Sequence, residues 1–368
     1  MKTRIAAFLA AGLLLAAAAQ AQDKAVVALS ANLMREAPDY TAELGDQALM
    51  GTVVELLDTS GYWIKIRTPE PYTAWVNELG LVPLDAAQLE DYLAAPKYIC
   101  TAFHSTVYAE PSTDAAVVSD LVAGDLVRIL YKTRTHTRGR LAGYEENTAV
   151  LSKRFVGVVL PSGKQGYVRT EDVDIFYRWA KETHAAALDG KKLGKQVCQT
   201  AQRLLGVPYM WGGTTTNYVD CSGLTRTVYF LNGVLLPRNA SQQAMVGEDV
   251  PIHAADGGIT ATALRPGDLL FWGKAAPEDS LRAHGFRRED ARGARAAGER
   301  VSHVGIYLGE GRFIHAAQVV RIGSLDPSDP DYYARTPIRA RRITGYVDEE
   351  GSGIRSLFTS AAYFPEGY

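Results

Sequence analysis

Two stretches in the first half of the chain repeat the same order of short β-rich runs. Each stretch contains apolar and β-branched runs separated by turn residues, which is typical of strands in a small antiparallel sheet. The repeat predicts two small all-β barrels, one over residues 25–86 and one over residues 97–176. The matching runs are residues 35–38 with 109–112, 51–57 with 124–130, and 74–76 with 166–168.

The second half of the chain changes to a pattern of helices followed by strands. Between the two β units, residues 87–96 have the pattern of a short helical linker that ends near Pro96. Helices first and an antiparallel sheet afterwards indicate an α+β domain. We expect helices over residues 178–187 and 193–205, and strands over residues 268–272, 304–308 and 313–320.

The first 21 residues have the layout of a secretory signal peptide. Lys2 and Arg4 form a short positive region, residues 5–19 are apolar or small, and residues 19–21 form a small-x-small cleavage signal. A membrane anchor is the less favoured alternative, because a transmembrane helix needs about 20 apolar residues. We expect residues 1–21 to be removed, leaving a periplasmic or secreted chain with no membrane span.

Charge and cysteine content narrow the function class. Lysine plus arginine is 39 and aspartate plus glutamate is 41, so the net charge of −2 argues against a nucleic-acid partner. The three cysteines, Cys100, Cys198 and Cys221, are too few for a disulfide scaffold, and their odd number leaves at least one unpaired. The unpaired thiol of an exported protein therefore needs a role of its own.

Cys221 is predicted in the first turn of a helix. Asp220 is a good N-cap residue, and Leu224 and Val228 follow at helical spacing. At such a position the helix dipole favours the thiolate, which is the nucleophilic form of cysteine. Taken alone, Cys221 is nevertheless better explained as a small core residue, because free cysteines are often buried.

Two histidines change that balance. His303 and His315 flank a predicted hairpin turn at residues 309–311. A three-residue turn sets a register that places Gly305 opposite His315 and turns both histidines to one face of the sheet. Their Cβ atoms would then be diagonal neighbours, about 7–8 Å apart. A two-residue turn would put them on opposite faces, so the prediction depends on the turn.

Cys221, His303 and His315 together predict a nucleophilic triad. The cysteine would attack, His303 would act as general base and then general acid, and His315 would orient His303. The same three residues are also an alternative set of zinc ligands, but their spacing matches no common zinc signature. We therefore expect no metal and no cofactor.

Five motifs surround these positions in a specific order, and that order resembles the NlpC family of papain-like bacterial cell-wall cysteine peptidases. The resemblance is strong over residues 185–345 and implies a papain-like α+β peptidase domain over residues 185–368. The two β units resemble bacterial SH3-like domains, a layout similar to that of the γ-D-glutamyl-L-diamino-acid endopeptidases. The motifs are Tyr-x-Trp-Gly-Gly at 209–213, Asp-Cys-Ser-Gly at 220–223, Leu-Pro-Arg at 236–238, Arg-Pro-Gly-Asp-Leu-Leu-Phe at 265–271 and Ser-His-Val-Gly-Ile-Tyr at 302–307.

The resemblance also implies a set of substrate-binding residues. Tyr209 is expected near the oxyanion, and Asn239 stands where the family often has an aspartate. Residues 274–300 form a longer stretch than the family usually has before the motif histidine, here His303. This stretch is either a mobile surface loop over the site or an insertion without a role in the function. The expected substrate-binding residues are Tyr209, Trp211, Asp220, Ser222, Asn239 and Ser302, with Tyr72 and Tyr108 from the SH3-like units.

The expected activity is cleavage between D-Glu and the diamino acid of murein peptides. Relatives with this domain layout act on short fragments with a free N-terminal L-Ala, which is consistent with cell-wall recycling. The partner is then a small murein peptide, and no nucleic acid is involved. A murein-binding module, and an amidase or acyltransferase on the same fold, are the alternatives.

Overall fold

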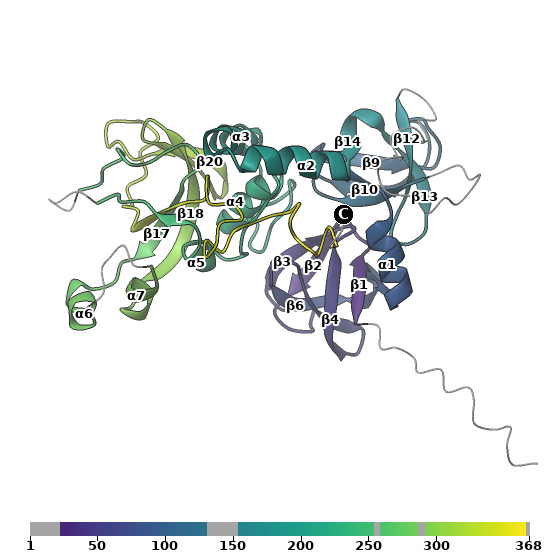
Figure 1. The fold of residues 1–368 in the computed structure, drawn as a ribbon, viewed down its shortest axis with the longest axis horizontal. Helices are drawn as coiled ribbons and strands as arrows, with labels where there is room; N and C mark the ends of the chain where they lie inside the picture. The colour runs from purple at the N-terminus through teal and green to yellow at the C-terminus, as the bar shows by residue number, and fades with distance from the viewer. Residues whose placement is uncertain (1–22, 131–153, 254–257, 286–290, 366–368) are drawn as a thin grey trace, which may run out of the picture.

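The structure is a computed structural model that describes residues 23–130, 154–253, 258–285 and 291–365. The expected signal peptide, residues 1–21, lies outside the described residues. In Figure 1 two β units lie together at one end of the molecule, and a unit of helices and strands occupies the other end. Among the described residues no helix is both long and apolar enough to cross a membrane.

The first β unit is one seven-stranded sheet, purple to blue in Figure 1. Its strands lie in the order β3-β2-β6-β5-β4-β1-β7. Alternate residues face the core, as in β6, where Ala74 and Val76 are buried and Trp75 between them is half-buried. The elements are β1 (Lys24–Val27), β2 (Ala31–Arg35), β3 (Leu44–Leu49), β4 (Val53–Ser60), β5 (Trp63–Arg67), β6 (Thr73–Asn77), η1 (Glu78–Gly80) and β7 (Leu81–Leu84).

The second β unit repeats this sheet strand for strand. Its order is β10-β9-β13-β12-β11-β8-β14, so each strand number is seven higher than its counterpart in the first sheet. The matching order confirms the fold class expected from the internal repeat. The elements are β8 (Lys97–Cys100), β9 (His104–Tyr108), β10 (Val117–Val122), β11 (Leu126–Ile129), β12 (Phe155–Val159), β13 (Gln165–Arg169), η3 (Thr170–Asp172) and β14 (Val173–Ile175).

The two β units are in direct contact. The predicted linker helix is α1 (Ala86–Ala94), which starts at Asp85 with a capping box. The turn between β3 and β4 reaches the second unit, where the N–H of Leu126 donates to the carbonyl of Met50 at 2.9 Å. Gly51 in this turn has φ +82°, and a Cβ there would lie 2.3 Å from the carbonyl oxygen of Leu126. A side chain at position 51 would therefore push the units apart.

The third unit packs helices against a six-stranded antiparallel sheet. The strand order is β16-β21-β17-β18-β19-β20, and α4 packs on β18 and β19 over an apolar core. The helices are α2 (Phe176–Ala187), α3 (Gly190–Arg203), α4 (Cys221–Phe230), α5 (Ala240–Gln243), α6 (Glu278–Ala283) and α7 (Ala291–Ala296). The strands are β15 (Val234–Leu235), β16 (Glu248–Asp249), β17 (Leu269–Lys274), β18 (Arg300–Gly309), β19 (Arg312–Ala317), β20 (Val319–Ser324), β21 (Arg339–Arg342) and β22 (Arg355–Ser356).

One predicted strand is two strands. The sequence predicts a single strand over residues 313–320, but β19 ends at Ala317 and β20 begins at Val319. Gln318 between them has φ +63°, so the chain reverses there and Ala317 pairs with Val319. The apolar run contains no Gly, Asn or Pro to signal this reversal, which is why the pattern did not predict it.

The C-terminal residues return to the β units. Leu357 and Tyr363 join a cluster with Phe176 of α2 and Phe230 of α4, and Figure 1 shows this yellow segment running back toward the first sheet. The hydroxyl of Tyr363 donates to Glu70 of the first unit at 3.2 Å. The end of the described chain therefore helps to hold the peptidase-like unit against the first sheet.

Candidate active site

Cys221 is the first residue of α4, as the sequence predicts. The Asp220 carboxylate accepts from the N–H of Gly223 at 2.7 Å and caps the helix. The thiol is half-buried, and backbone N–H groups of Val304 and Ser222 donate to it. The Val304 contact brings the nucleophile candidate to β18, next to His303.

The surroundings of the Cys221 thiol raise its pKa, contrary to the expectation from the helix dipole. Burial, together with the neighbouring Asp220 carboxylate, raises the pKa of Cys221 to about 11. The two N–H donors and Arg238 act in the opposite direction but do not outweigh burial. The capping carboxylate that starts the helix thus weakens the effect of the dipole on the sulfur.

His303 and His315 project from the same sheet face and touch. Gly305 pairs with His315, as predicted, and Nε2 of His303 lies 2.8 Å from Nδ1 of His315. The turn itself differs from the prediction, because only Glu310 and Gly311 separate the two strands. A register shift between Tyr307 and Gly309 adds one residue to β18 and restores the predicted register at the histidines.

An aromatic box of Trp272, Phe313 and Tyr333 surrounds the two imidazoles. The Trp272 ring centroid lies 5.6 Å from that of His303, and the Tyr333 centroid lies 4.9 Å from that of His315. Burial lowers the pKa of His303 to about 4, with a smaller contribution from Arg335. Burial also lowers the pKa of His315 to about 3. Both rings are therefore neutral near pH 7.

The contact between the histidines fixes how their protons are arranged. If Nε2 of His303 donates to His315, Nδ1 of His303 is left as the basic nitrogen. His315 then carries its own proton on Nε2, which is buried and has no hydrogen-bond partner among the described residues. The ring of Tyr333 packs against the His315 imidazole in a T-shaped contact.

A buried ionic network holds the residue before the nucleophile. Arg238 donates to both Asp220 and Ser222, and Ser222 donates to Asp220 at 3.1 Å. Asp46, from β3 of the first unit, lies 3.2 Å from Nε of Arg238 and 2.7 Å from Nη1 of Arg226. Asp46, Asp220 and Arg238 are all buried. The substrate roles expected for Asp220 and Ser222 stay predictions, while the structure shows both bound to Arg238.

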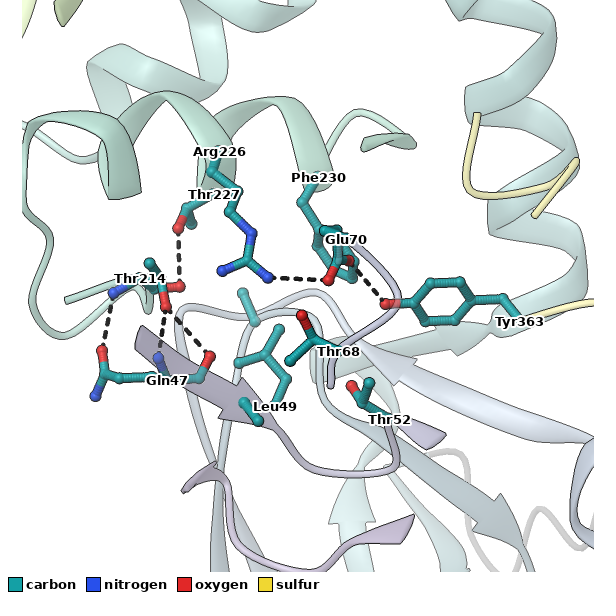
Figure 2. Close-up of a pocket in the computed structure, with 12 residues that line it drawn as sticks. Gln47, Leu49, Thr52, Thr68, Glu70, Thr214, Arg226, Thr227, Phe230 and Tyr363 are labelled. Atoms are coloured by element: carbon teal, nitrogen blue, oxygen red, sulfur yellow. Dashed lines mark hydrogen bonds and ion pairs between the residues drawn. The ribbon is translucent and has the colours of Figure 1, made fainter. Parts of the chain in front are cut away.

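Figure 2 shows the same joint one turn further along α4. Arg226 reaches from α4 to Glu70 of the first unit at 3.0 Å, and Glu70 also accepts from Tyr363. The N–H of Thr214 donates to the side-chain oxygen of Gln47 at 2.9 Å, and the N–H of Gln47 donates to the hydroxyl of Thr214 at 3.2 Å. The cavity between these side chains measures about 30 Å³, so the joint is closely packed.

The first unit also contacts the loop that carries Trp211. Gly212 has φ +80°, and a Cβ there would lie 2.5 Å from the carbonyl oxygen of Leu44. Tyr72 is half-buried, and its hydroxyl donates to Glu36, an exposed carboxylate. Burial and Glu36 raise the pKa of Tyr72, and Arg238 is near enough to oppose that shift. Tyr72 therefore lies on the side of the first unit that faces the network.

The other predicted site residues are spread around this centre. Tyr209 is half-buried and close to Cys221, and burial raises its pKa to about 12. Trp211 is 62% exposed. Asn239 is exposed at the start of α5, and Ser302 donates to the carbonyl of Trp272 at 3.5 Å.

Tyr108 lies on the second sheet, where its ring meets that of Phe155 edge-on. No contact found among the described residues joins it to the centre.

Two residues of the site, Asp46 and Tyr333, have no signal in the sequence analysis. Asp46 is far along the chain from its partner Arg238, which belongs to the Leu-Pro-Arg motif, and Tyr333 lies in a segment without a motif. Within the described ranges, His, Cys, Asp and Glu form no group of three or more that could hold a metal ion.

Comparison with known proteins assigns the family. The sequence profile of the NlpC/P60 family matches residues 206–282, and that of the bacterial SH3 domain matches residues 32–80. A probable endopeptidase NlpC homologue of Haemophilus influenzae is 30% identical over 172 residues, 46% of this chain and 71% of that protein. The chain belongs to the NlpC/P60 family. It is a cysteine peptidase of that family with SH3-like units before the peptidase fold.

Two relatives match most of the chain. The dipeptidyl-peptidase 6 of Lysinibacillus sphaericus is 27% identical over 312 residues, 83% of this chain and 93% of that protein. A γ-D-glutamyl-L-lysine dipeptidyl-peptidase of Bacillus cereus is 27% identical over 308 residues, 82% of this chain and 75% of that protein. A crystal structure of an NlpC/P60 family protein from Bacillus cereus shares the fold, with a TM-score of 0.60 at 21% identity over 87% of this chain and 99% of that one.

Proposed function

We propose that the protein is an exported endopeptidase that cleaves the bond between γ-D-Glu and the diamino acid of short murein peptides. The observation that carries this proposal is the 2.8 Å contact between His303 and His315 beside the helix that starts at Cys221. This arrangement offers a nucleophile, a base and a residue that orients the base. The Bacillus cereus relative named for a γ-D-glutamyl-L-lysine bond supports the choice of substrate.

In the proposed reaction, Cys221 attacks the γ-carbonyl carbon of D-Glu. As the C–S bond forms, the thiol proton passes to Nδ1 of His303, and His315 holds the imidazolium through Nε2. The tetrahedral intermediate then collapses, the C–N bond breaks, and His303 returns the proton to the departing amine. Water, deprotonated by His303, cleaves the thioester and releases the dipeptide and the free thiol.

The first SH3-like unit is proposed to limit the length of the substrate on the acyl side. Leu44 lies against Gly212, so the first unit stands beside the loop that precedes the nucleophile. A free N-terminal amine needs a carboxylate partner, and Asn239 is neutral. Glu36, which accepts from Tyr72, is an exposed carboxylate on this side and is our candidate for that contact.

The proposed location is the periplasm or the outside of the cell, because residues 1–21 have the layout of a signal peptide. A peptidase there that prefers small soluble fragments would recycle or scavenge cell-wall peptides.

Incubation with L-Ala-γ-D-Glu-diaminopimelate, followed by mass spectrometry, tests the activity. We expect L-Ala-D-Glu and the free diamino acid, and no product from Cys221→Ala. An N-acetylated substrate should react much more slowly if a carboxylate holds the amine. Release of no diamino acid from the free-amine substrate would refute the proposal, as would full activity of Cys221→Ala.

A further inference from the structure

The described residues of the stretch before His303 form two short helices that are anchored to the sheet. Residues 274–300 include α6 and α7, which pack on one another through a small apolar cluster of Ala276, Leu281, Ala294 and Ala297. Glu299 is buried and forms an ion pair with Arg339 of β21 at 3.0 Å. The described part of this insertion is therefore attached to β21 of the peptidase sheet.

A cationic groove lies between this insertion and the peptidase fold. It measures about 770 Å³, a volume that suits a small ligand. The side chains of Arg295 and Arg300 are exposed, and Lys274 pairs with Arg300 across the sheet. The carboxylate of Glu299 is already neutralised by Arg339. The groove is lined by Ser241, Met245, Arg292, Arg295, Arg300 and Val301, among others.

Arg300 is oriented by the backbone rather than by an acidic side chain. Its Nη1 donates to the carbonyls of Glu299 and Arg295, at 2.8 and 3.4 Å. Among the described residues, these are the hydrogen bonds of the Arg300 guanidinium, and no carboxylate forms an ion pair with it. A guanidinium held in this way can still present its other N–H groups to an anionic ligand.

The groove lies beside the strand that carries His303, with Val301 of β18 and Ser241 of α5 in its lining. Val301 lies two residues before His303, and α5 follows Arg238 of the ionic network. At about 3.3 Å per residue, Arg300 is roughly 10 Å along the strand from His303. In Figure 1, α4 and α5 lie between the first sheet and α7. With the acyl part on the side of the first unit, the departing part lies on the groove side.

We propose that this groove binds the departing diamino acid, and that Arg295 and Arg300 select diaminopimelate over lysine. The inference rests on the proposed function, in which His303 gives its proton to the departing amine. The side chain of lysine ends in an ammonium group alone, whereas that of diaminopimelate also ends in a carboxylate. The two carboxyl carbons of extended diaminopimelate are roughly 8 Å apart at C–C bonds of about 1.5 Å. This length is comparable with the distance of roughly 10 Å along the strand between His303 and Arg300.

Electrostatics favour the same choice. An arginine fork binds a carboxylate through two parallel hydrogen bonds, which adds geometric selection to charge attraction. The same positive charges repel the ammonium group of a lysine side chain, so the groove disfavours one product and favours the other.

The test compares three substrates that share the L-Ala-γ-D-Glu part. Two release diaminopimelate or lysine, and the third releases a neutral fluorescent aminocoumarin. We expect the parent enzyme to prefer the diaminopimelate peptide by about tenfold or more in kcat/KM, the size of one charge-assisted contact. Arg295→Gln combined with Arg300→Gln should reduce that preference to within about threefold while leaving cleavage of the coumarin amide unchanged.

Two controls separate charge from folding. The pair Arg295→Lys and Arg300→Lys keeps the charge and should keep most of the preference. Arg282→Gln removes an exposed arginine of α6 and should change none of the three rates. The preference of the parent should also weaken as salt is added, because the groove is exposed.

Different results would overturn the inference and the proposed function. Equal cleavage of the two peptides by the parent would overturn the inference, as would an unchanged preference in the glutamine variant. Failure of the parent to cleave any of the three substrates would instead overturn the proposed function.

Discussion

Asp46 of the first SH3-like unit lies 3.2 Å from Nε of Arg238, the residue that clamps the N-cap of the nucleophile's helix. The first unit therefore contributes the buried charge of Asp46 to the network next to the nucleophile, in addition to the packing of Leu44 against Gly212. The contact joins β3 to the start of α4 through a single arginine. This contact and the geometry around Cys221 lead to five predictions.

Replacing Asp46 by Asn should destabilise the whole molecule. Arg226 and Arg238 would lose a buried partner, and removal of one member of a buried ion pair costs about 3–5 kcal/mol. We expect a lower urea midpoint and a fall of at least about tenfold in kcat/KM, since α4 would be held less firmly. Asp58→Asn, at the exposed end of β4, is the matched control. Unfolding of Asp46→Asn at the parent's midpoint would show that the ion pairs do not hold the joint.

His315→Phe should lower kcat with little effect on KM. The ring would still fill the aromatic box but would no longer accept the hydrogen bond from His303. We expect a loss of about 100-fold in kcat, within the range for a residue that supports acid–base catalysis. His315→Asn should retain more activity, because its amide oxygen can accept the same bond. His104→Phe, on an exposed position of β9, should behave like the parent in steady-state assays.

Activity should fall only at low pH. His303 must be neutral to accept the thiol proton, and burial lowers its pKa to about 4. The acid limb of kcat/KM should therefore lie near pH 4 rather than near 6.5. A half-maximal rate near pH 6.5 would contradict the burial of His303 in the free enzyme.

The same two histidines should make folding weaker in acid. Their folded pKa values are lowered, so the folded state binds fewer protons than the unfolded state between about pH 6.5 and 4. The free energy of unfolding should therefore fall as the pH drops through this window. Replacing both histidines by Asn should flatten that dependence, as measured by urea unfolding at several pH values.

Alkylation should separate the three cysteines. All three are free, and burial raises the pKa of each thiol. Cys100 and Cys198 are buried, whereas Cys221 is half-buried. Iodoacetamide should therefore label Cys221 first, slowly at pH 7 and faster as the pH approaches about 11. Peptide mapping by mass spectrometry measures the order, and early labelling of Cys198 would show that α3 opens in solution.

The local part of the site could be predicted from the sequence. Asp220 and the helical spacing after Cys221 predict the start of α4, because capping and periodicity act within a few residues. The sequence also predicts the pairing of Gly305 with His315, although it predicts a three-residue turn where the structure has two residues. A bulge at Leu308 compensates for the shorter turn, and bulges have no reliable residue signature.

The long-range part could not be predicted in this way. Asp46 and Arg238 are brought together by the packing of separate units, and neither position carries a local pattern that names the other. Tyr333 reaches the histidines from a segment without periodicity. The thiol's protonation was mispredicted for a related reason, since burial is a property of the assembled fold rather than of the helix start.

The contact between Tyr363 and Glu70 has a consequence for the order of assembly. The two residues are 293 positions apart, and the C-terminal one closes the joint shown in Figure 2. At about 5–20 residues per second of synthesis, roughly 15–60 s pass between the synthesis of Glu70 and that of Tyr363. During that interval the first sheet can form while its joint to α4 is unfinished. The joint between the first sheet and α4 is therefore complete only after Tyr363 has been synthesised.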